Sequence, residues 1–480
     1  MGKENRWKVY DETKLAELDA LAEDYKRFMN VVKTEREAVR EITARAEKEG
    51  YRNLDEIIEA GGTLKAGDKV YAVWMKKTIA LFTVGTQPIA KGLRILGAHI
   101  DSPRLDLKQV PLYEDTEMAF LDTHYYGGVK KYQWTTTPLA IHGVIAKKDG
   151  SVVDVSIGEE ENDPVFCVTD LLIHLSKDQM AKKLEDAIKG ENLDVLVGSR
   201  PLTIRADEAK TAKEACADGE KEGSAAKELV RKNILAILKE KYGMEEDDFL
   251  SAELEVVPAG RMRDLGLDRS MIAGYGQDDR VCAFTSLDAF FRVEHPQYTA
   301  CCLLTDKEEI GSVGATGARS RFFENAVADL MDRCGQYSEL ALRRALSSSR
   351  MLSSDVSAAY DPLYGEAYEK KNSAYFGHGI VYNKYTGSRG KSGSNDANAE
   401  YFAWVRRVMD EADVAFQTAE LGKVDIGGGG TIAYISALYG MDVVDAGIAV
   451  LNMHAPMEVT SKSDIYEARN AYAAFLSAEQ

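Results

Sequence analysis

One short segment of the sequence combines residue types that can bind a metal ion. Residues 94–104 contain an apolar run that ends with His99 and Asp101, and side chains two residues apart on a strand lie on the same face. A histidine that binds a metal needs an acceptor for its second ring nitrogen, and a carboxylate two residues away can supply one or bind a second ion. For this pair alone, a polar strand end that caps the turn before Pro103 is the more ordinary explanation.

Further candidate ligands follow apolar runs or begin turns later in the chain, and these are Asp278, Glu308, Glu309, Asp355 and His454. If each follows a strand of one sheet, the sheet brings them to a single edge together with His99. Two divalent ions roughly 4 Å apart need one bridging carboxylate, both histidine and carboxylate ligands, and an open position for water. Glu308 and Glu309 would point in opposite directions in an extended chain, so we expect one to bind metal and the other to act as a general base.

Each of these residues also has an ordinary structural explanation when it is taken alone. Acidic pairs commonly cap helices, and an aspartate or a run of glycines commonly forms a turn. Residues 427–430 are all glycine, but no Gly-Lys-Ser/Thr sequence follows, so they form no Walker motif. The joint occurrence of the acidic clusters after successive strands indicates a metallohydrolase. We count Gly430 and Thr431, at the end of the glycine run, among the candidate substrate-binding residues.

The composition is that of a globular protein with more than one domain. The chain has 480 residues, of which 45% are hydrophobic and 29% charged, and a formal net charge of −18. Its length favours two domains, and its acidity argues against nucleic acids and anionic membranes as partners. Six cysteines without a Cys-x-x-Cys spacing fit a reducing compartment, and we expect neither a signal peptide nor a membrane span. These features predict a cytoplasmic protein.

Alternating strand and helix patterns predict the main elements. We expect one or two helices in residues 11–49, strands over 70–75, 78–84 and 93–100, and from residue 252 a strand–helix alternation with helices over 278–291, 321–348 and 398–410. This alternation predicts an α/β sheet with helices on both faces, which binds ligands beyond the carboxyl ends of its strands.

None of the candidate metal ligands lies between residues 112 and 251, so we expect this span to be an inserted second domain. Residues 1–111 and 252–480 would then form the catalytic domain. Within the insertion, residues 207–228 are a polar tract without an apolar face, which predicts an exposed loop or a solvated helix.

Five motifs resemble, in the same order and over nearly the whole chain, those of the aspartyl aminopeptidase and vacuolar aminopeptidase I family of two-zinc exopeptidases. They are Gly97-Ala-His-Ile-Asp-Ser-Pro, Gln277-Asp-Asp-Arg, Asp306-Lys-Glu-Glu-Ile-Gly-Ser, Ser353-Ser-Asp and Met453-His. The resemblance, to a divergent bacterial-type branch, implies a phosphorylase/hydrolase-like mixed sheet with helices on both faces, interrupted by an inserted β-rich dimerisation domain. It also implies dimers that assemble into a tetrahedral dodecamer.

The resemblance implies a role for each candidate in the metal site. Carried over position by position, the resemblance implies that His99 and Asp355 hold one zinc, that Glu309 and His454 hold a second, and that Asp278 bridges the two. It also implies that Glu308 is the general base and that Asp101 supports His99. Cobalt and manganese accept the same ligand types as zinc, so the metal itself stays open.

The sequence departs from aspartyl aminopeptidases where their substrate-contacting residues lie. Residues 126–139 lack the Asp-Arg-Asp of the corresponding stretch, and Ala358 and Asp361 stand where that group has histidines. The lysine thought to meet an acidic substrate corresponds to Lys384 only with a shift of one residue. Lys384 stays a candidate for that contact, but a preference for acidic N-terminal residues does not follow.

His174 lies among leucines and an isoleucine in the expected insertion. From these residues alone, a core or interface histidine bonded to a carbonyl oxygen is the ordinary explanation. The resemblance implies instead that this histidine reaches the active site of a neighbouring subunit and contacts the substrate there.

These observations together predict a zinc-dependent aminopeptidase that acts on peptides. One alternative is another two-metal amidohydrolase of similar fold, such as a deacylase or a carboxypeptidase. Another is a non-catalytic assembly scaffold that has kept the fold.

Overall fold

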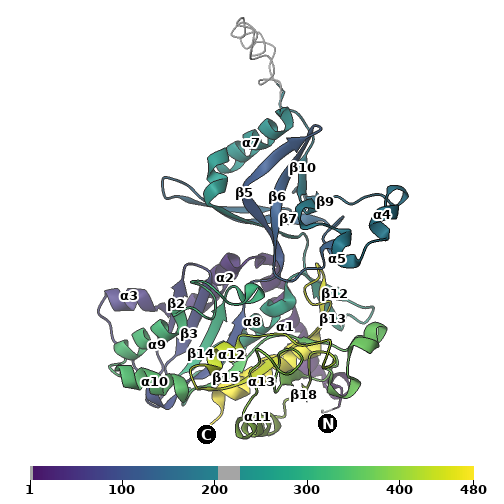
Figure 1. Cartoon of the computed structure of the whole chain (residues 1–480). Helices are drawn as coiled ribbons and strands as arrows, with labels where there is room; N and C mark the ends of the chain where they lie inside the picture. The colour runs from purple at the N-terminus through teal and green to yellow at the C-terminus, as the bar shows by residue number, and fades with distance from the viewer. Residues whose placement is uncertain (1–3, 204–227, 480) are drawn as a thin grey trace, which may run out of the picture. The chain divides into compact units, whose positions relative to one another are not determined.

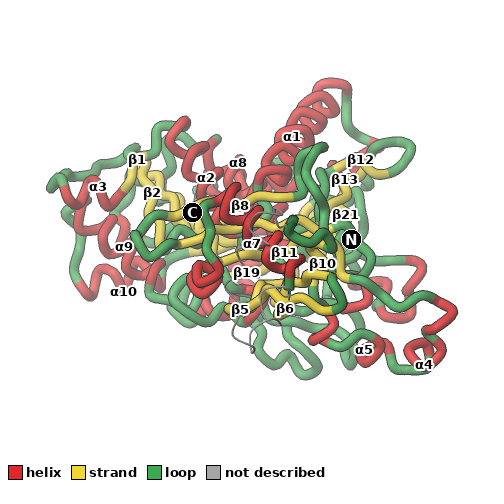
Figure 2. Tube along the Cα trace, turned by 90° about the horizontal axis from the view of Figure 1, so that it is seen from above, coloured by secondary structure: helices red, strands yellow, loops and turns green. Residues whose placement is uncertain are grey.

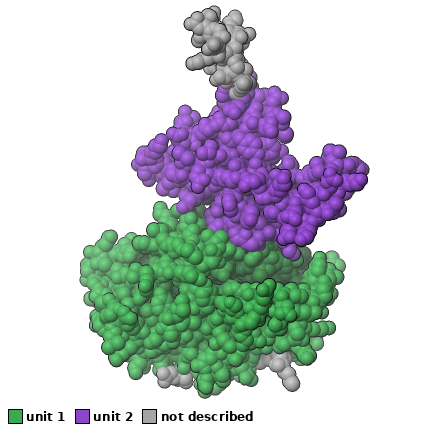
Figure 3. All heavy atoms as spheres, viewed as in Figure 1, with its two compact units in different colours: residues 1–102, 261–480 green, residues 103–260 purple. Residues whose placement is uncertain are grey.

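The computed structural model describes residues 4–203 and 228–479, which form two compact units. One unit consists of residues 1–102 and 261–480, and the other consists of residues 103–260 (Figure 3). The second unit is therefore an insertion in the sequence of the first. The polar tract that we expected at residues 207–228 lies outside the described residues, apart from its last residue. Within the described part of the chain, no helix is both long enough and apolar enough to cross a membrane.

A nine-stranded mixed sheet forms the centre of the first unit, in the order β1-β2-β3-β14-β4-β15-β19-β17-β18. Four parallel strands lie in its middle, β14 (Ala300–Thr305), β4 (Arg94–His99), β15 (Arg350–Ser353) and β19 (Asp442–Gly447). The flanking strands are β1 (Arg52–Asn53), β2 (Lys69–Trp74), β3 (Thr78–Thr83), β17 (Ile380–Asn383) and β18 (Phe416–Thr418). The expected strands near residues 70, 78 and 93 are confirmed.

Helices pack on both faces of this sheet, as the alternation of its buried side chains requires. The adjacent residues Cys301 and Cys302 of β14 belong to different core clusters. The cluster of Cys302 includes residues of α1 (Glu12–Val31), α2 (Glu35–Lys48), α8 (Gln277–Phe291), α11 (Ala399–Glu411) and α13 (Lys462–Ser477). The cluster of Cys301 includes residues of α3 (Leu54–Glu59), α9 (Phe322–Arg333), α10 (Glu339–Ser347) and α12 (Ala433–Ala437). These helices are labelled in Figure 1, and Figure 2 shows α1, α2, α3, α8, α9 and α10 from above.

The single helix expected over residues 321–348 is wrong, because the structure has two helices there, α9 and α10. Gly335 between them has φ +66°, a backbone conformation that ends a helix.

A smaller five-stranded sheet also belongs to the first unit, in the order β12-β13-β21-β20-β16. Its strands are β12 (Arg263–Leu265), β13 (Met271–Gly274), β16 (Ser357–Ala358), β20 (Ala449–Leu451) and β21 (Glu458–Ser461). The antiparallel pairing of β13 with β21 matters for the site, because α8 begins shortly after β13 and β21 follows the loop that contains His454.

The second unit is built on a seven-stranded sheet in the order β8-β7-β11-β5-β6-β10-β9, whose neighbouring strands are antiparallel. Its strands are β5 (Arg104–Asp115), β6 (Met118–Tyr126), β7 (Leu139–Ala146), β8 (Val152–Ile157), β9 (Cys167–Val168), β10 (Val195–Gly198) and β11 (Ala252–Pro258). The described helices of this unit are α4 (Lys177–Met180), α5 (Leu184–Ala187) and α7 (Leu229–Tyr242).

The two compact units divide near residues 102 and 260, whereas we expected domain boundaries near residues 111 and 251. The difference arises because β5 begins at Arg104 and because β11 pairs with β5 and β7. Strand β11 therefore belongs to the sheet of the inserted unit, although we expected it to begin the second part of the catalytic domain.

Candidate functional site

Four of the six candidate ligands lie at the carboxyl ends of the central parallel strands or in turns next to them. The other two, Asp278 and His454, lie beside strands β13 and β21 of the five-stranded sheet, so the expectation that one sheet would carry all six is wrong. His99 is the last residue of β4, and Asp355 lies two residues beyond the end of β15. Glu308 and Glu309 begin a 3-10 turn shortly after β14. Since β14, β4 and β15 are adjacent and parallel, their carboxyl ends meet at one edge of the sheet.

Two groups of candidate ligands share a single aspartate. One group contains His99, Asp278 and Asp355, the other contains Asp278, Glu309 and His454, and the ligand atoms of each group lie within 4.8 Å of one another. Oδ1 of Asp278 is 3.2 Å from Nε2 of His99, and Oδ2 is 3.2 Å from Nε2 of His454. The two oxygens of one carboxylate thus face two different histidines, which is the arrangement of a bridging ligand.

We expected Glu308 and Glu309 to point in opposite directions, as they would in an extended chain. The structure shows that they do not. The segment is a 3-10 turn that begins after Lys307, whose φ is +68°, so both carboxylates face the same cluster. Oε2 of Glu309 is 3.5 Å from Nε2 of His454, and Oε2 of Glu308 is 4.0 Å from Nε2 of His99. Glu309 belongs to one of the two ligand groups and Glu308 does not.

The carboxylate of Asp101 contacts both His99 and the glutamate turn. Its Oδ1 is 3.3 Å from Nδ1 of His99, the nitrogen opposite the one that faces Asp278. Oδ1 also accepts a hydrogen bond from the backbone N–H of Glu308 (3.1 Å), and Oδ2 accepts one from the backbone N–H of Glu309 (3.2 Å). Asp101 therefore orients an imidazole and holds the turn that carries two acidic side chains.

Burial and opposite charges shift the pKa values of the site in different directions. Burial raises the pKa of Glu308 above its usual value, although His99 opposes this shift. Burial also raises the pKa of Glu309, and the nearby Asp278 adds to that shift. Burial acts the same way on Asp278, but hydrogen bonds with His454 and His99 outweigh it and lower the pKa of Asp278. The cluster therefore concentrates negative charge that a cation would neutralise.

The donor atoms fit zinc. Oε1 of Glu309 is buried and has no hydrogen-bond partner among the described residues, and such an oxygen is costly to bury unless it binds a cation. Imidazole nitrogens and carboxylate oxygens are zinc ligands in proteins. When one ring nitrogen of a histidine binds a metal ion, a carboxylate commonly contacts the other ring nitrogen, as Asp101 contacts Nδ1 of His99 here.

Asp445 and Glu458 are among the buried acidic residues near the cluster that were not sequence candidates. Asp445 of β19 accepts a hydrogen bond from Oγ1 of Thr431 (2.6 Å), and burial raises its pKa to about 7. Glu458 begins β21 and accepts from the backbone of Asp278 and His454. Asp445 sits in an apolar run and Glu458 comes four residues after His454, and neither position has a spacing that marks it as part of a site.

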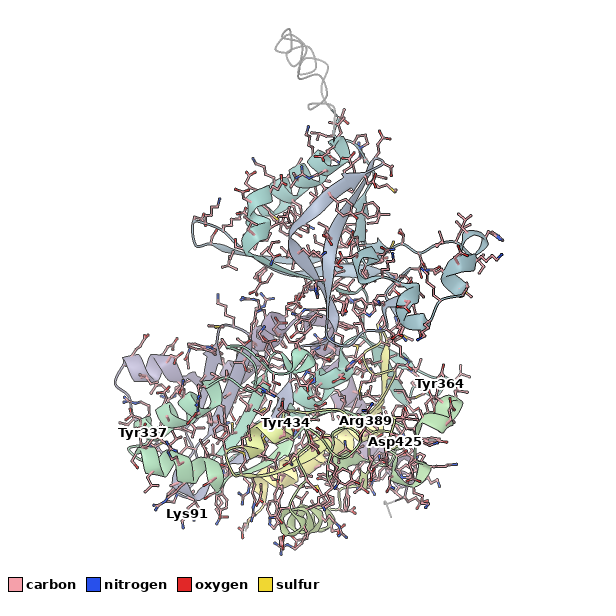
Figure 4. The ribbon with its side chains drawn as sticks, viewed as in Figure 1. Lys91, Tyr337, Tyr364, Arg389, Asp425 and Tyr434 are labelled. Carbon is pink, nitrogen blue, oxygen red and sulfur yellow. The ribbon has the colours of Figure 1, made fainter. Side chains whose placement is uncertain are left out.

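The glycine run that ends in Gly430 and Thr431 lies beside an aromatic residue of α12. An added Cβ at Gly430 would lie 3.9 Å from Cε1 of Tyr434, which is labelled in Figure 4. The guanidinium of Arg319 is 5.4 Å from the centre of the Tyr434 ring. The contact of Thr431 with Asp445 links this loop to the central sheet. A substrate role for Gly430 or Thr431 remains a prediction.

The side chain of Lys384 forms an ion pair with Asp396. It follows β17 directly, is 46% exposed, and its Nζ lies 3.7 Å from Oδ1 of Asp396. Lys391 also pairs with Asp396, at 3.0 Å. A carboxylate already neutralises part of the charge that Lys384 would offer to an acidic substrate.

His174 is not buried in the core of its own unit, so the core position is wrong, while an interface position stays a prediction. It lies in the short 3-10 helix Ile173–Leu175 and is exposed, as are its apolar neighbours. The exposed apolar residues of this segment are Leu171, Leu172, Ile173, Leu175, Met180 and Leu184, with 48% to 73% of each exposed.

Comparisons with known proteins agree over almost the whole chain. A family model described as "Aminopeptidase I zinc metalloprotease (M18)" matches residues 28–476. The "Probable M18 family aminopeptidase 1" of Clostridium acetobutylicum is 58% identical over 473 residues, which are 98% of each chain.

Solved structures of M18 aminopeptidases have the same fold. An M18 family aminopeptidase from Thermotoga maritima superposes with a TM-score of 0.90 at 42% identity, and aminopeptidase I from Clostridium acetobutylicum superposes with 0.89 at 54%, each over 99% of both chains. The more distant S. cerevisiae mApe1 dodecamer shares the fold, with a TM-score of 0.73 at 20% identity over 96% of this chain and 97% of its own.

Proposed function

Because the chain belongs to the aminopeptidase I zinc metalloprotease family (M18), we propose that it removes the N-terminal residue of peptides at a two-zinc site with a glutamate base. The observation that carries this proposal is the pair of ligand groups that share Asp278. His99, Asp278 and Asp355 would hold one zinc, and Asp278, Glu309 and His454 would hold the other.

Zinc at this site supplies Lewis acidity, which polarises the scissile carbonyl group and lowers the pKa of a bound water. The protein holds each ligand in advance of binding. Asp101 fixes the ring of His99 through Nδ1, which lies 3.1 Å from the backbone carbonyl oxygen and 3.3 Å from the carboxylate of Asp101, so Nε2 faces Asp278 and the metal position. Because the ligand atoms within each group already lie within 4.8 Å, little rearrangement is needed to close around an ion.

Glu308 moves the proton in this mechanism. It lies at the cluster without joining either ligand group, so its carboxylate is left to act as a base and not as a ligand. Its carboxylate takes a proton from the attacking water and then gives that proton to the leaving amine. Its backbone N–H is held by Asp101, so the carboxylate is presented from a fixed turn.

A substrate panel with metal analysis on the same sample tests this proposal. Aminoacyl anilides with a free amine should be cleaved, whereas N-acylated amino acids and peptides blocked at the N-terminus should not. Protein purified without chelator should contain about two zinc ions per chain. Cleavage of N-acylated amino acids would favour a deacylase, release of C-terminal residues would favour a carboxypeptidase, and inactivity of the zinc-loaded protein would favour a scaffold.

We propose that the substrate range includes neutral N-terminal residues. Lys384 faces Asp396, and Ala358 and Asp361 offer no imidazole, so a strong selection for acidic side chains lacks its charged partners. Leucyl substrates should be cleaved at rates equal to or higher than those of aspartyl substrates. An aspartyl rate more than about tenfold higher, which corresponds to about 1.4 kcal/mol, would contradict this range.

We propose further that the inserted unit forms a homodimer through the exposed apolar segment around His174. Contiguous exposed apolar side chains are characteristic of interaction surfaces, and burying Ile173 and Leu175, which are 68% and 66% exposed, would favour association. In the dimer, His174 would contact the substrate bound by the partner subunit. The dodecamer and the cytoplasmic location expected from the sequence remain part of this proposal.

A further inference from the structure

Glu458 connects two ligands that come from distant parts of the sequence. Its side chain belongs to the first residue of β21 and is buried, with 1% of the residue exposed. Oε2 accepts a hydrogen bond from the backbone N–H of Asp278 (3.1 Å), and Oε1 accepts one from the backbone N–H of His454 (2.8 Å). One carboxylate thus holds the backbone of the bridging ligand and the backbone of a terminal ligand.

The segment that carries Asp278 is also fixed to β21 by the residue before it. Nε2 of Gln277 donates to the carbonyl oxygen of Glu458 (2.7 Å), and Oε1 of Gln277 accepts from Oγ1 of Thr460 (2.7 Å). Gly274 of β13 pairs directly with Glu458 in the sheet. Both the main chain and the side chain of Glu458 therefore set the position of the segment that begins α8.

His454 has particular need of such a contact. It lies in the loop between β20 and β21, its φ is +65°, and 35% of its side chain is exposed. A left-handed backbone conformation is uncommon for a residue other than glycine and persists only where the surroundings hold it. The bond from its N–H to Glu458 supplies a buried partner at this point.

We propose that Glu458 is a positioning residue that fixes Asp278 and His454 relative to each other, so that the group of Asp278, Glu309 and His454 is preformed for its metal ion. This inference rests on the proposed two-metal function. A carboxylate is required because both of its oxygens accept hydrogen bonds here. A glutamine amide has one accepting oxygen, and its NH2 group would face a second N–H donor.

Glu458→Gln and Glu458→Ala test this role in the full-length metal-loaded protein. We expect the apparent affinity for zinc to fall about 10- to 100-fold, as for other residues that support a metal ligand. At limiting zinc the loss should be larger for the group of Asp278, Glu309 and His454, because Glu458 holds two members of that group and only Asp278 of the other. The absorption spectrum of the cobalt-substituted variants should change, and kcat at saturating zinc should fall by more than about tenfold while KM changes less.

Asp464→Asn provides a matched control. Asp464 is also buried, and its two oxygens accept from the backbone N–H groups of Gly377 (2.9 Å) and Gly379 (2.8 Å), which belong to neither ligand group. This variant should keep the wild-type zinc affinity and cobalt spectrum, whatever its thermal stability. If it loses zinc to the same extent, the effect of Glu458 is a general consequence of removing a buried carboxylate.

Wild-type zinc affinity and an unchanged cobalt spectrum in both Glu458 variants would overturn the proposal. If Glu458→Ala does not fold, the result with Glu458→Gln decides, since that change preserves the shape of the side chain. A wild-type protein that binds two ions but cleaves no peptide would refute the proposed function, while the comparison of metal affinities would still decide the role of Glu458.

Discussion

At the scale of single residues, the adjacent Glu308 and Glu309 have different neighbours and therefore different expected roles. Glu309 shares a ligand group with His454, whereas Glu308 lies beside the cluster. Glu308→Gln should keep about two zinc ions per chain and lower kcat by about 10²- to 10⁴-fold, which is the usual contribution of a general base. Zinc analysis and steady-state kinetics on one preparation measure both effects. Near wild-type turnover with zinc bound would assign the base to another residue.

Asp101 is expected to matter without being a ligand. In Asp101→Asn only one side-chain oxygen is left to accept from the N–H groups of Glu308 and Glu309, and the contact with His99 weakens. Activity or zinc affinity should fall about 10- to 100-fold. Asp288→Asn, at the far end of α8, makes the same chemical change on a carboxylate that pairs with Arg292 and should have little effect. Complete loss of metal in Asp101→Asn would instead make Asp101 a ligand.

The sequence identified the ligand candidates because each ends an apolar run or begins a turn. It did not reveal that Asp101 binds the N–H groups of the glutamate turn, because the turn is a 3-10 turn and not an extended segment. Glu458 was missed for a related reason. A single glutamate four residues after a histidine has no distinctive spacing, and its role depends on the pairing of β13 with β21.

At the scale of elements, Asp464 of α13, which is hydrogen-bonded to the loop at residues 377–379, is expected to contribute a pH-dependent part of the stability. Burial raises its pKa from 3.8 to about 7, although hydrogen bonds from Gly379 and Gly377 oppose the shift. The folded chain therefore holds this proton more tightly than the unfolded chain. The resulting stability is fully present below about pH 4 and is lost as the pH rises through about 7.

Thermal unfolding of wild type and Asp464→Asn across about pH 5 to pH 8 tests this pH dependence. The variant side chain stays uncharged, so the wild-type Tm should decline relative to that of the variant over this range, by less than the roughly 2–4 °C for each kcal/mol that applies to domains of about 150–250 residues. Two Tm curves that run parallel would show that Asp464 does not titrate in this range.

Periodicity predicted which segments form helices and strands better than it predicted their partners. The strand at residues 252–258 was expected and is present, but it pairs with β5 and β7 of the inserted unit. Strand propensity reflects a side-chain pattern and carries no information about which sheet the strand joins. The boundary error of about ten residues at each end of the insertion follows from this limit.

At the scale of the whole molecule, the proposed dimer makes each active site depend on two chains. His174→Ala and Glu308→Ala should each be inactive alone. Mixed under conditions of subunit exchange, they should recover part of the activity, because a mixed dimer can combine an intact Glu308 from one chain with an intact His174 from the other. A mixture as inactive as its parts, with exchange verified by labelled subunits, would leave His174 without a catalytic role.

The exposure of the segment around His174 could not be read from its sequence. Four apolar neighbours predict burial in a core, and the structure places them on the surface of the chain. An apolar run that is buried only by assembly has the same composition as one buried by folding. The resemblance to a known family, and not the pattern of residues, pointed to the alternative.

Anomalous diffraction at the zinc edge, from crystals of protein purified without chelator, tests the two-metal site most directly. We predict two peaks per chain, about 3.5–4 Å apart, one beside His99 and Asp355 and the other beside Glu309 and His454. The two oxygens of Asp278 should contact one peak each. A single peak, or two peaks of which only one touches Asp278, would contradict the two-metal site on which the proposed mechanism depends.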